Sequence, residues 1–165
     1  MGQRKPAMVW RPAAPTNYTD ASRGRRKVNR IIIHVTQGSW AGSVNWFANP
    51  NAAVSAHYVV RSSDGKIAQC VKNQDIAWHA GNWDYNTRSI GIEHEGFVDD
   101  PAWFTEEMFR SSAKLVAYLH GQWGIPLDRD HIIGHNEVPG SSHTDPGEWW
   151  WWSHYMELVR HYWRT

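Results

Sequence analysis

The chain has 165 residues and a formal net charge of +1 at neutral pH. This length fits one domain with a core that needs no disulfides, and the single cysteine, Cys70, excludes an internal disulfide and a cysteine-based zinc finger. The balanced charge gives no general case for nucleic acid, and no apolar run approaches the roughly 20 residues of a membrane span. The 12 tryptophans and 10 histidines are unusual. They indicate a stacking or heavily packed surface and a metal or proton-transfer site.

The N-terminal segment is rich in arginine, lysine and proline. Its prolines oppose helix formation. Basic side chains cluster toward its end: Arg23, Arg25, Arg26, Lys27 and Arg30. We expect one domain over residues 1–165, with an extended, solvated basic arm at 1–29 and the core at 30–160. Attraction of the cluster to an anionic polymer is the less favoured interpretation.

Two stretches that follow are typical of β-structure. Residues 30–35 contain four β-branched side chains and His34, which predicts a buried strand. A lone histidine in a strand is usually a satisfied core residue, but His34 lies where the chain leaves the sheet, and α/β sites collect at strand ends. Residues 55–71 predict a hairpin with a structural His57, and residues 41–48 predict a short helix between the two.

The loop at residues 78–83 combines indole planes with an imidazole and an amide, from Trp78, His79 and Asn82. A packed structural loop and a surface for a sugar-peptide ligand explain this combination about equally well.

Residues 89–96 predict a second central strand. Alternation places Glu93 and Glu95 on the face opposite to His94 and the isoleucines. A carboxylate within an apolar strand is costly to bury unless it is paired or used. An ion pair is the ordinary explanation, but we favour a functional role for Glu93, because it follows Ile92 and lies deeper in the strand.

The C-terminal third predicts a long helix, a short strand and a closing helix. Thr105 suits the N-cap of the long helix and Gly124 suits its end, while residues 132–133 form a short strand that leads into His135. In the last segment, several apolar side chains share one helical face: Trp149, Trp152, Met156, Val159 and Trp163. A closing helix anchored by indoles is favoured over a ligand-binding role.

The loop at residues 134–147 holds two histidines and two carboxylates among prolines and glycines, and it is too polar for a core. Histidine nitrogens and an aspartate oxygen are standard zinc ligands, and a catalytic zinc site has three protein ligands. We expect one zinc ion between three residues: His34, His135 and Asp145. Hydrolysis at such a site needs a base for the water proton and a donor for the developing oxyanion. Glu93 suits the first role and His143 the second.

Six motifs occur in a fixed order: Ile31-Ile32-Ile33-His34, Ser55-Ala56-His57-Tyr58, Ala77-Trp78-His79-Ala80-Gly81, Ser89-Ile90-Gly91-Ile92-Glu93, Gly134-His135 and Thr144-Asp145-Pro146-Gly147. From about Arg30 to about Val159, this set resembles the type 2 N-acetylmuramoyl-L-alanine amidases, relatives of peptidoglycan recognition proteins. It is most similar to the catalytic domains of actinobacterial wall amidases and phage endolysins. The resemblance implies an α/β fold, with a mixed central β-sheet flanked by helices and a zinc groove on one side. It also implies hydrolysis of the amide between the lactyl group of N-acetylmuramic acid and L-alanine of the peptidoglycan stem peptide.

The resemblance matches the zinc ligands of the family to His34, His135 and Asp145, and the catalytic glutamate to Glu93. Two positions depart from the family pattern. His143 stands where many members have a lysine; because a histidine is only partly protonated at neutral pH, we expect oxyanion stabilisation to weaken as pH rises. Ala56 stands where the recognition-protein and phage branches have a catalytic tyrosine, which shifts the catalytic burden to Glu93.

Two rival functions stay open: a non-catalytic peptidoglycan-binding module, and a zinc peptidase that cuts peptide–peptide bonds. Competent residues at all three ligand positions favour the enzyme. The expected substrate contacts are Trp78, His79 and Asn82. We further expect a monomer that acts on peptidoglycan at the cell wall, with no nucleic acid partner and no membrane span. It is either secreted or delivered by a phage from the host cytoplasm, since the N-terminus lacks the apolar segment of a signal peptide.

Overall fold

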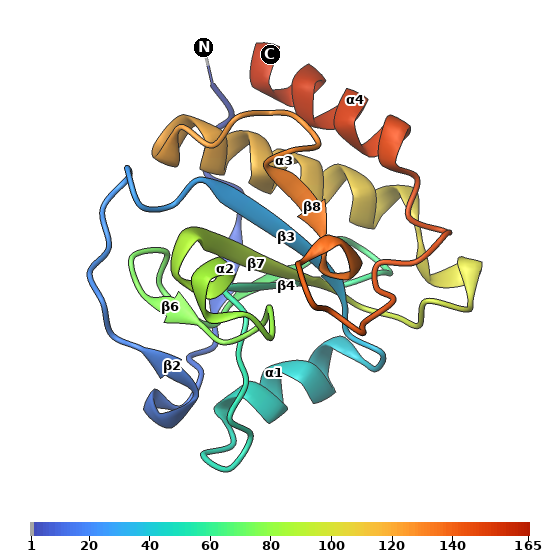
Figure 1. The fold of residues 1–165 in the computed structure, drawn as a ribbon. Helices are drawn as coiled ribbons and strands as arrows, with labels where there is room; N and C mark the ends of the chain where they lie inside the picture. Colours follow the sequence, from blue (N-terminus) through green and yellow to red (C-terminus); the bar gives the residue numbers. More distant parts are fainter. Residues whose placement is uncertain (1) are drawn as a thin grey trace.

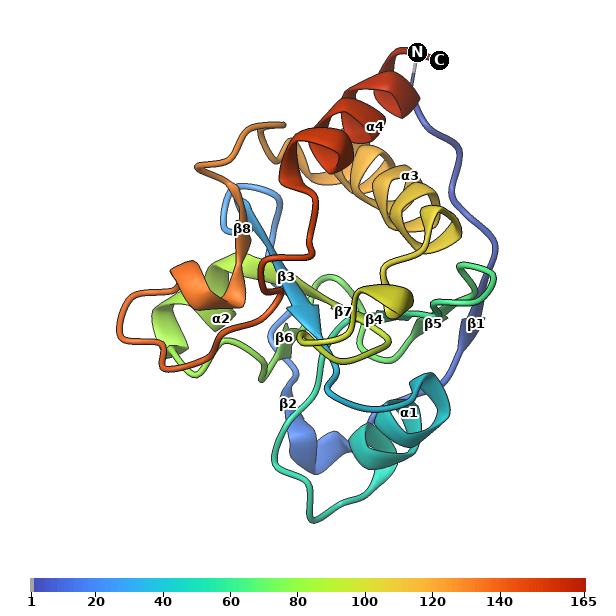
Figure 2. The same cartoon turned by 90° about the vertical axis from the view of Figure 1, so that its right-hand side faces the viewer.

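The computed structural model describes residues 2–165. Its centre is a six-stranded mixed sheet in the order β1-β5-β4-β7-β3-β8 (Figures 1 and 2). In chain order its strands are β1 (Met8–Trp10), β3 (Arg30–Val35), β4 (Tyr58–Val60), β5 (Ile67–Gln69), β7 (Ser89–His94) and β8 (Ile132–Gly134). Strands β4 and β5 form the expected antiparallel hairpin, and the other pairs are parallel. The predicted α/β fold with a mixed sheet is confirmed.

Helices cover both faces of this sheet. They are α1 (Trp40–Ala48), α2 (Trp83–Arg88), α3 (Glu106–Trp123) and α4 (Trp152–Arg164), with three short 3₁₀ turns, η1 (Pro15–Asn17), η2 (Pro101–Trp103) and η3 (His135–Glu137). Helices α3 and α4 lie side by side over one face, while α1, α2 and η3 lie on the other (Figures 1 and 2). No helix within residues 2–165 is long and apolar enough to cross a bilayer.

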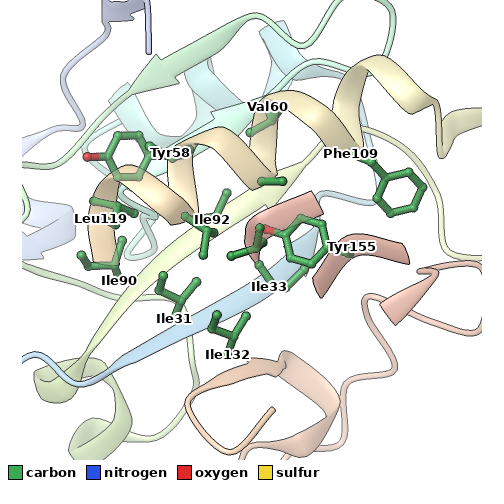
Figure 3. Packing of buried hydrophobic residues seen from close by; sticks show 14 of the residues in the cluster. Ile31, Ile33, Tyr58, Val60, Ile90, Ile92, Phe109, Leu119, Ile132 and Tyr155 are labelled. Atoms are coloured by element: carbon green, nitrogen blue, oxygen red, sulfur yellow. The ribbon is translucent and has the colours of Figure 1, made fainter. Parts of the chain in front are cut away.

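Alternation along the two central strands decides what each face carries. Ile31 and Ile33 of β3, like Ile90 and Ile92 of β7, pack into the core beneath α3 and α4, which Figure 3 shows together with Tyr155. These side chains are almost completely removed from water, and each contributes roughly 1.5–3 kcal/mol through the hydrophobic effect. The residues between them therefore point to the opposite face.

On that opposite face, the parallel register of β3 and β7 aligns His34 with Glu93. Both are near the carboxyl ends of their strands, where α/β folds place ligands. The predicted alternation of residues 89–94 is confirmed, because Ile90 and Ile92 belong to the core cluster and Glu93 does not.

The helix on the core side begins and ends where its sequence requires. The Thr105 hydroxyl accepts a hydrogen bond from the Met108 amide at 3.1 Å, which caps α3. Gly124 ends the helix with a φ of 70°, a conformation that favours glycine.

The N-terminal segment contains more structure than the expected arm. Strand β1 pairs with β5 at the sheet edge, and β2 (Tyr18–Thr19) pairs with β6 (Ile76–Ala77). The prediction of a solvated cluster is wrong for Arg23, which is only 7% exposed. Its guanidinium donates to the carbonyl oxygens of Asn86 and Ser89 at 2.9 and 2.6 Å, so these hydrogen bonds compensate its burial.

The closing helix also begins later than its pattern suggests. Helix α4 starts at Trp152, so Trp149 lies outside it and is 45% exposed, contrary to its predicted place on the buried face. The neighbouring Trp150 is the buried indole. Met156 and Val159 are buried as predicted.

Candidate metal centre and active site

The three predicted metal ligands meet at the carboxyl ends of β3 and β8. His34 belongs to β3, His135 opens η3 directly after β8, and Asp145 comes from the loop that follows. All three are buried, and each offers one ligand atom within 4.8 Å of the others. The loop packs closely against Gly134, because a Cβ there would lie 2.7 Å from Cδ of the Pro146 ring.

The distances between the ligand atoms fit a small divalent cation. The two Nδ1 atoms of His34 and His135 lie 3.1 Å apart. Asp145 Oδ2 lies 3.5 Å from His34 Nδ1, and Asp145 Oδ1 lies 3.1 Å from His135 Nδ1. Zinc bonds of 2.0–2.1 Å in a tetrahedron give ligand–ligand edges of about 3.3 Å. The three side chains therefore fit a metal in the place that the sequence predicts.

The Asp145 carboxylate is fixed by a backbone hydrogen bond. Its Oδ2 accepts from the Val35 amide at 3.1 Å. Burial by itself raises the pKa of this carboxyl, but hydrogen bonds and attraction from His135 and His34 outweigh burial and hold the pKa well below its usual range. Burial also lowers the pKa of His34. A charged carboxylate beside a neutral imidazole is the protonation state that metal binding requires.

Glu93 lies beside this group with one oxygen unused. Its Oε1 is 3.9 Å from His34 Nδ1, while its Oε2 is buried and has no hydrogen-bond partner. Burial, followed by repulsion from Asp145, raises the pKa of Glu93 well above its usual range. Glu95, directly after β7, differs from Glu93 in that both of its carboxylate oxygens have partners: they accept from the Trp40 and Ser62 amides at 2.7 and 2.9 Å. Glu95 is structural, whereas Glu93 is suited to proton transfer.

His143 stands at the edge of the metal centre. Its ring stacks on that of His135, with centroids 4.0 Å apart, and its Nδ1 lies 3.9 Å from Asp145 Oδ1. The side chain is 61% exposed. It can therefore reach a bound ligand without being a buried ligand of the metal itself.

A cavity of about 510 Å³ opens over the metal centre. Glu93, His143 and the three ligand residues line it, and so do Trp78 and His79. The structure thus brings together all but one of the residues that the sequence predicts for the site. The exception is Asn82, which does not line the cavity: its side chain caps α2 through the Tyr85 amide and donates to the Pro139 carbonyl.

Comparison with known proteins decides the family. A sequence profile described as N-acetylmuramoyl-L-alanine amidase matches residues 24–148. The chain belongs to this amidase family. It is 37% identical to N-acetylmuramoyl-L-alanine amidase A of Achromobacter lyticus, with 92% of each chain covered. It is 35% identical to the 1,6-anhydro-N-acetylmuramyl-L-alanine amidase AmpD of Salmonella typhimurium, with 88% of each chain covered.

Solved structures of other proteins share the amidase fold. The crystal structure of a selenomethionine AmpD derivative superposes with a TM-score of 0.75 at 25% identity, covering 92% of this chain and 94% of that one. The amidase AmiD from E. coli, in complex with anhydro-N-acetylmuramic acid-L-Ala-D-gamma-Glu-L-Lys, gives a TM-score of 0.67 at 21% identity and covers 84% of this chain and 60% of that one. The predicted family and fold are confirmed.

Two groups of residues in this amidase site escape sequence reasoning. Trp46 on α1 and Val54 after it line the cavity and are 49% and 38% exposed. The sequence feature that could have indicated Trp46 is an apolar side chain on the outer face of the short predicted helix. Asn86 on α2 also lines the cavity. No spacing pattern marks it, because α2 has only six residues.

Proposed function

We propose that this amidase is a zinc enzyme that cleaves the amide between the lactyl group of N-acetylmuramic acid and L-alanine of peptidoglycan stem peptides. Membership of the family supports the reaction class. The observation that carries the proposal is the buried group of three ligand atoms at zinc-like separations, with the Glu93 carboxylate beside it, 3.9 Å from His34 Nδ1.

The residues divide the chemistry between them. His34, His135 and Asp145 would hold the ion, which when bound supplies a Lewis acid and lowers the pKa of water to about 7. Glu93 accepts a proton from the attacking water at Oε1, the oxygen that lies 3.9 Å from His34 Nδ1, and returns it to the leaving nitrogen of L-alanine as the carbon–nitrogen bond breaks. A carboxyl with a raised pKa suits both transfers, because general acid–base catalysis is most efficient when the pKa lies near the working pH.

The remaining groups bind and orient the substrate. His143, exposed at the cavity edge, donates to the carbonyl oxygen as negative charge develops on it. Trp78 is held by a hydrogen bond from its Nε1 to Thr19 Oγ1 at 2.9 Å, which leaves the indole plane as a fixed wall of the cavity. With Trp46 and Val54 it forms an apolar side that suits a sugar face and a lactyl group. His79 and Asn82 have structural partners, and a direct substrate contact by either stays a prediction.

The decisive experiment is product analysis on two substrates, purified peptidoglycan and a soluble 1,6-anhydromuropeptide. Mass spectrometry should show intact stem peptides with a free N-terminal alanine; a chelator should stop their release and added zinc should restore it. Zinc measured in the same sample separates the rivals. No release by zinc-loaded protein would indicate a binding module, and cleavage within the stem peptide would indicate a peptidase. Release of stem peptides from the soluble 1,6-anhydromuropeptide but not from peptidoglycan would show that the substrate is the soluble fragment and not the polymer.

Action at the cell wall follows from a polymeric substrate and belongs to the same proposal. Secretion, delivery by a phage and a monomeric state stay predictions from the sequence.

A further inference from the structure

The Nε2 atoms of the two candidate metal-binding histidines, His34 and His135, have hydrogen-bond partners on two consecutive residues, His79 and Ala80. His34 Nε2 lies 2.8 Å from His79 Nδ1, and His135 Nε2 lies 3.2 Å from the carbonyl oxygen of Ala80. Because both histidines face the metal position with Nδ1, their Nε2 atoms carry the protons and donate these hydrogen bonds. Partners of this kind set the tautomer and the orientation of metal-binding imidazoles.

One side chain holds this residue pair in place. Asn86 Oδ1 accepts from the amides of His79 and Ala80 at 3.2 and 2.8 Å. Asn86 is 6% exposed and Ala80 is 2% exposed, so solvent cannot readily replace these bonds. One carboxamide oxygen therefore holds the backbone of both residues of the pair.

The His79 ring is confined from two further sides. Its Nε2 lies 3.2 Å from Ser89 Oγ, and the ring rests on Gly91, where a Cβ would come within 2.6 Å of it. A neutral ring that donates to Ser89 through Nε2 must accept at Nδ1, which is what His34 needs.

Asn86 itself is anchored from the N-terminal segment. Helix α2 has six residues, too few to be stable alone. Arg23 donates from Nη1 to the Asn86 carbonyl and from Nη2 to the Ser89 carbonyl, and this fixes the last turn of α2 and the start of β7. The chain of contacts runs without a gap from Arg23 through Asn86 and the His79–Ala80 pair to the metal histidines.

We propose that Asn86 is a positioning residue of the metal centre, which sets the orientation of His34 and His135 by holding His79 and Ala80. The inference rests on the metal site of the proposed function and adds a determinant of metal affinity outside the ligand set.

The test is the zinc dissociation constant, measured by competition with a chromogenic chelator on the full chain. Asn86→Ala should weaken zinc binding at least tenfold, in line with the 10- to 100-fold cost of losing outer contacts of metal ligands. Asn86→Asp keeps an acceptor oxygen in the same place and should recover most of the affinity. Ser89→Ala removes only a hydroxyl, so it should fold more readily than Asn86→Ala, and it should weaken zinc binding about threefold.

Asn17→Ala is the matched control. Asn17 is also a buried asparagine that bridges backbone groups, donating to Phe47 and Asn49 carbonyls and accepting from the Ala53 amide, but it does not touch the metal histidines. Its variant should lose thermal stability and keep the zinc affinity of the parent.

Two results would overturn the inference: an unchanged dissociation constant in folded Asn86→Ala, or an equal loss in Asn86→Ala and Asn17→Ala. Failure of the unmodified chain to bind zinc would instead remove the metal site of the proposed function, and this inference with it. A second readout is the imidazole Nε2–H proton signals of His34 and His135 in zinc-loaded protein. They should exchange slowly with water in the parent and rapidly in Asn86→Ala.

Discussion

Each face of the β3–β7 strand pair carries a buried histidine. On the face covered by α3 and α4, His94 Nδ1 lies 2.9 Å from the carbonyl oxygen of His34, and its Nε2 lies 2.7 Å from Ser112 Oγ. That hydroxyl in turn lies 2.8 Å from the Tyr155 hydroxyl. On the opposite face, His34 points toward two other potential metal ligands, and its Nδ1 lies 3.9 Å from Glu93 Oε1.

The two histidine networks differ in whether the hydrogen bonds of their own members are complete. The His94 network satisfies both ring nitrogens within the protein, and burial lowers the pKa of His94 to about 3, so the ring is neutral. The His34 face leaves a buried carboxylate oxygen without a partner, which costs free energy in the absence of a ligand. Complete buried networks stabilise a fold, and incomplete ones are expected where a protein binds or reacts. The following variants test this contrast.

The largest effect is expected from Asp145→Ala. Removing the carboxylate leaves two imidazoles whose Nδ1 atoms are 3.1 Å apart, with no carboxylate in the ligand set to balance a cation. Zinc per chain after dialysis should fall from about one to near zero by elemental analysis, and amide hydrolysis should fall to background. Full zinc content in this variant would refute the ligand assignment.

Glu93→Gln should separate metal binding from catalysis. The amide cannot accept the water proton, so kcat should fall at least 100-fold, within the range for losing general acid–base catalysis, while zinc content stays near one per chain. Glu95→Gln is the control, because Glu95 accepts backbone hydrogen bonds only, and its kcat should stay within threefold of the parent. Similar kcat values for the parent and Glu93→Gln would exclude Glu93 from the mechanism.

Ser112→Ala breaks the network on the other face. It leaves the His94 and Tyr155 polar atoms without their shared hydroxyl partner, which should lower the free energy of unfolding by about 1–3 kcal/mol in urea denaturation. Zinc affinity and kcat should stay within threefold of the parent values. A tenfold weaker zinc affinity would show that the His94 contact with the His34 carbonyl couples the two faces.

A third buried histidine gives the stability a pH dependence. Burial, reinforced by repulsion from Arg23, lowers the pKa of His57 to about 3; its Nδ1 accepts from the Gly91 amide at 3.0 Å and its Nε2 lies 2.9 Å from the Asp75 carbonyl oxygen. The unfolded chain takes up a proton at a pKa near 6.5. The stabilisation is therefore complete above about pH 6.5 and is lost as the pH falls toward 3.

In the metal-free chain, this histidine should account for about 2 kcal/mol of the stability lost between pH 7 and pH 5. His57→Asn keeps an acceptor for the Gly91 amide and removes the titration. Its loss of unfolding free energy between these pH values, measured in urea, should be smaller than that of the parent by this amount. The same pH dependence in both proteins would show that His57 is not held neutral.

The sequence predicts best what depends on local pattern and residue type. The β-branched run 30–35 predicts its strand from residue type alone. The three candidate metal ligands could be predicted because His34, His135 and Asp145 stand in motifs that resemble the amidase family, and the structure brings them together. Arg23 is different: the two carbonyl oxygens that it holds beside the site lie 63 and 66 residues away, so the basic cluster looks solvated until the chain is folded. The sequence does not predict Asn86 as part of the site for a related reason: a six-residue helix has too few turns to show periodicity.

The smallest effect is expected at His143, the most exposed member of the site. His143→Ala should lower kcat about tenfold, or ~1.4 kcal/mol, which is less than the 100- to 1000-fold loss typical of a buried oxyanion donor, because water can partly replace an exposed group. His143→Phe preserves the stack on His135 and lacks the ring nitrogens. If His143 acts as a donor, Phe and Ala should lose the same activity while zinc affinity is unchanged. Parent-like kcat in His143→Phe would assign the residue to packing against a metal ligand, and the donor of the oxyanion would have to be sought elsewhere in the cavity.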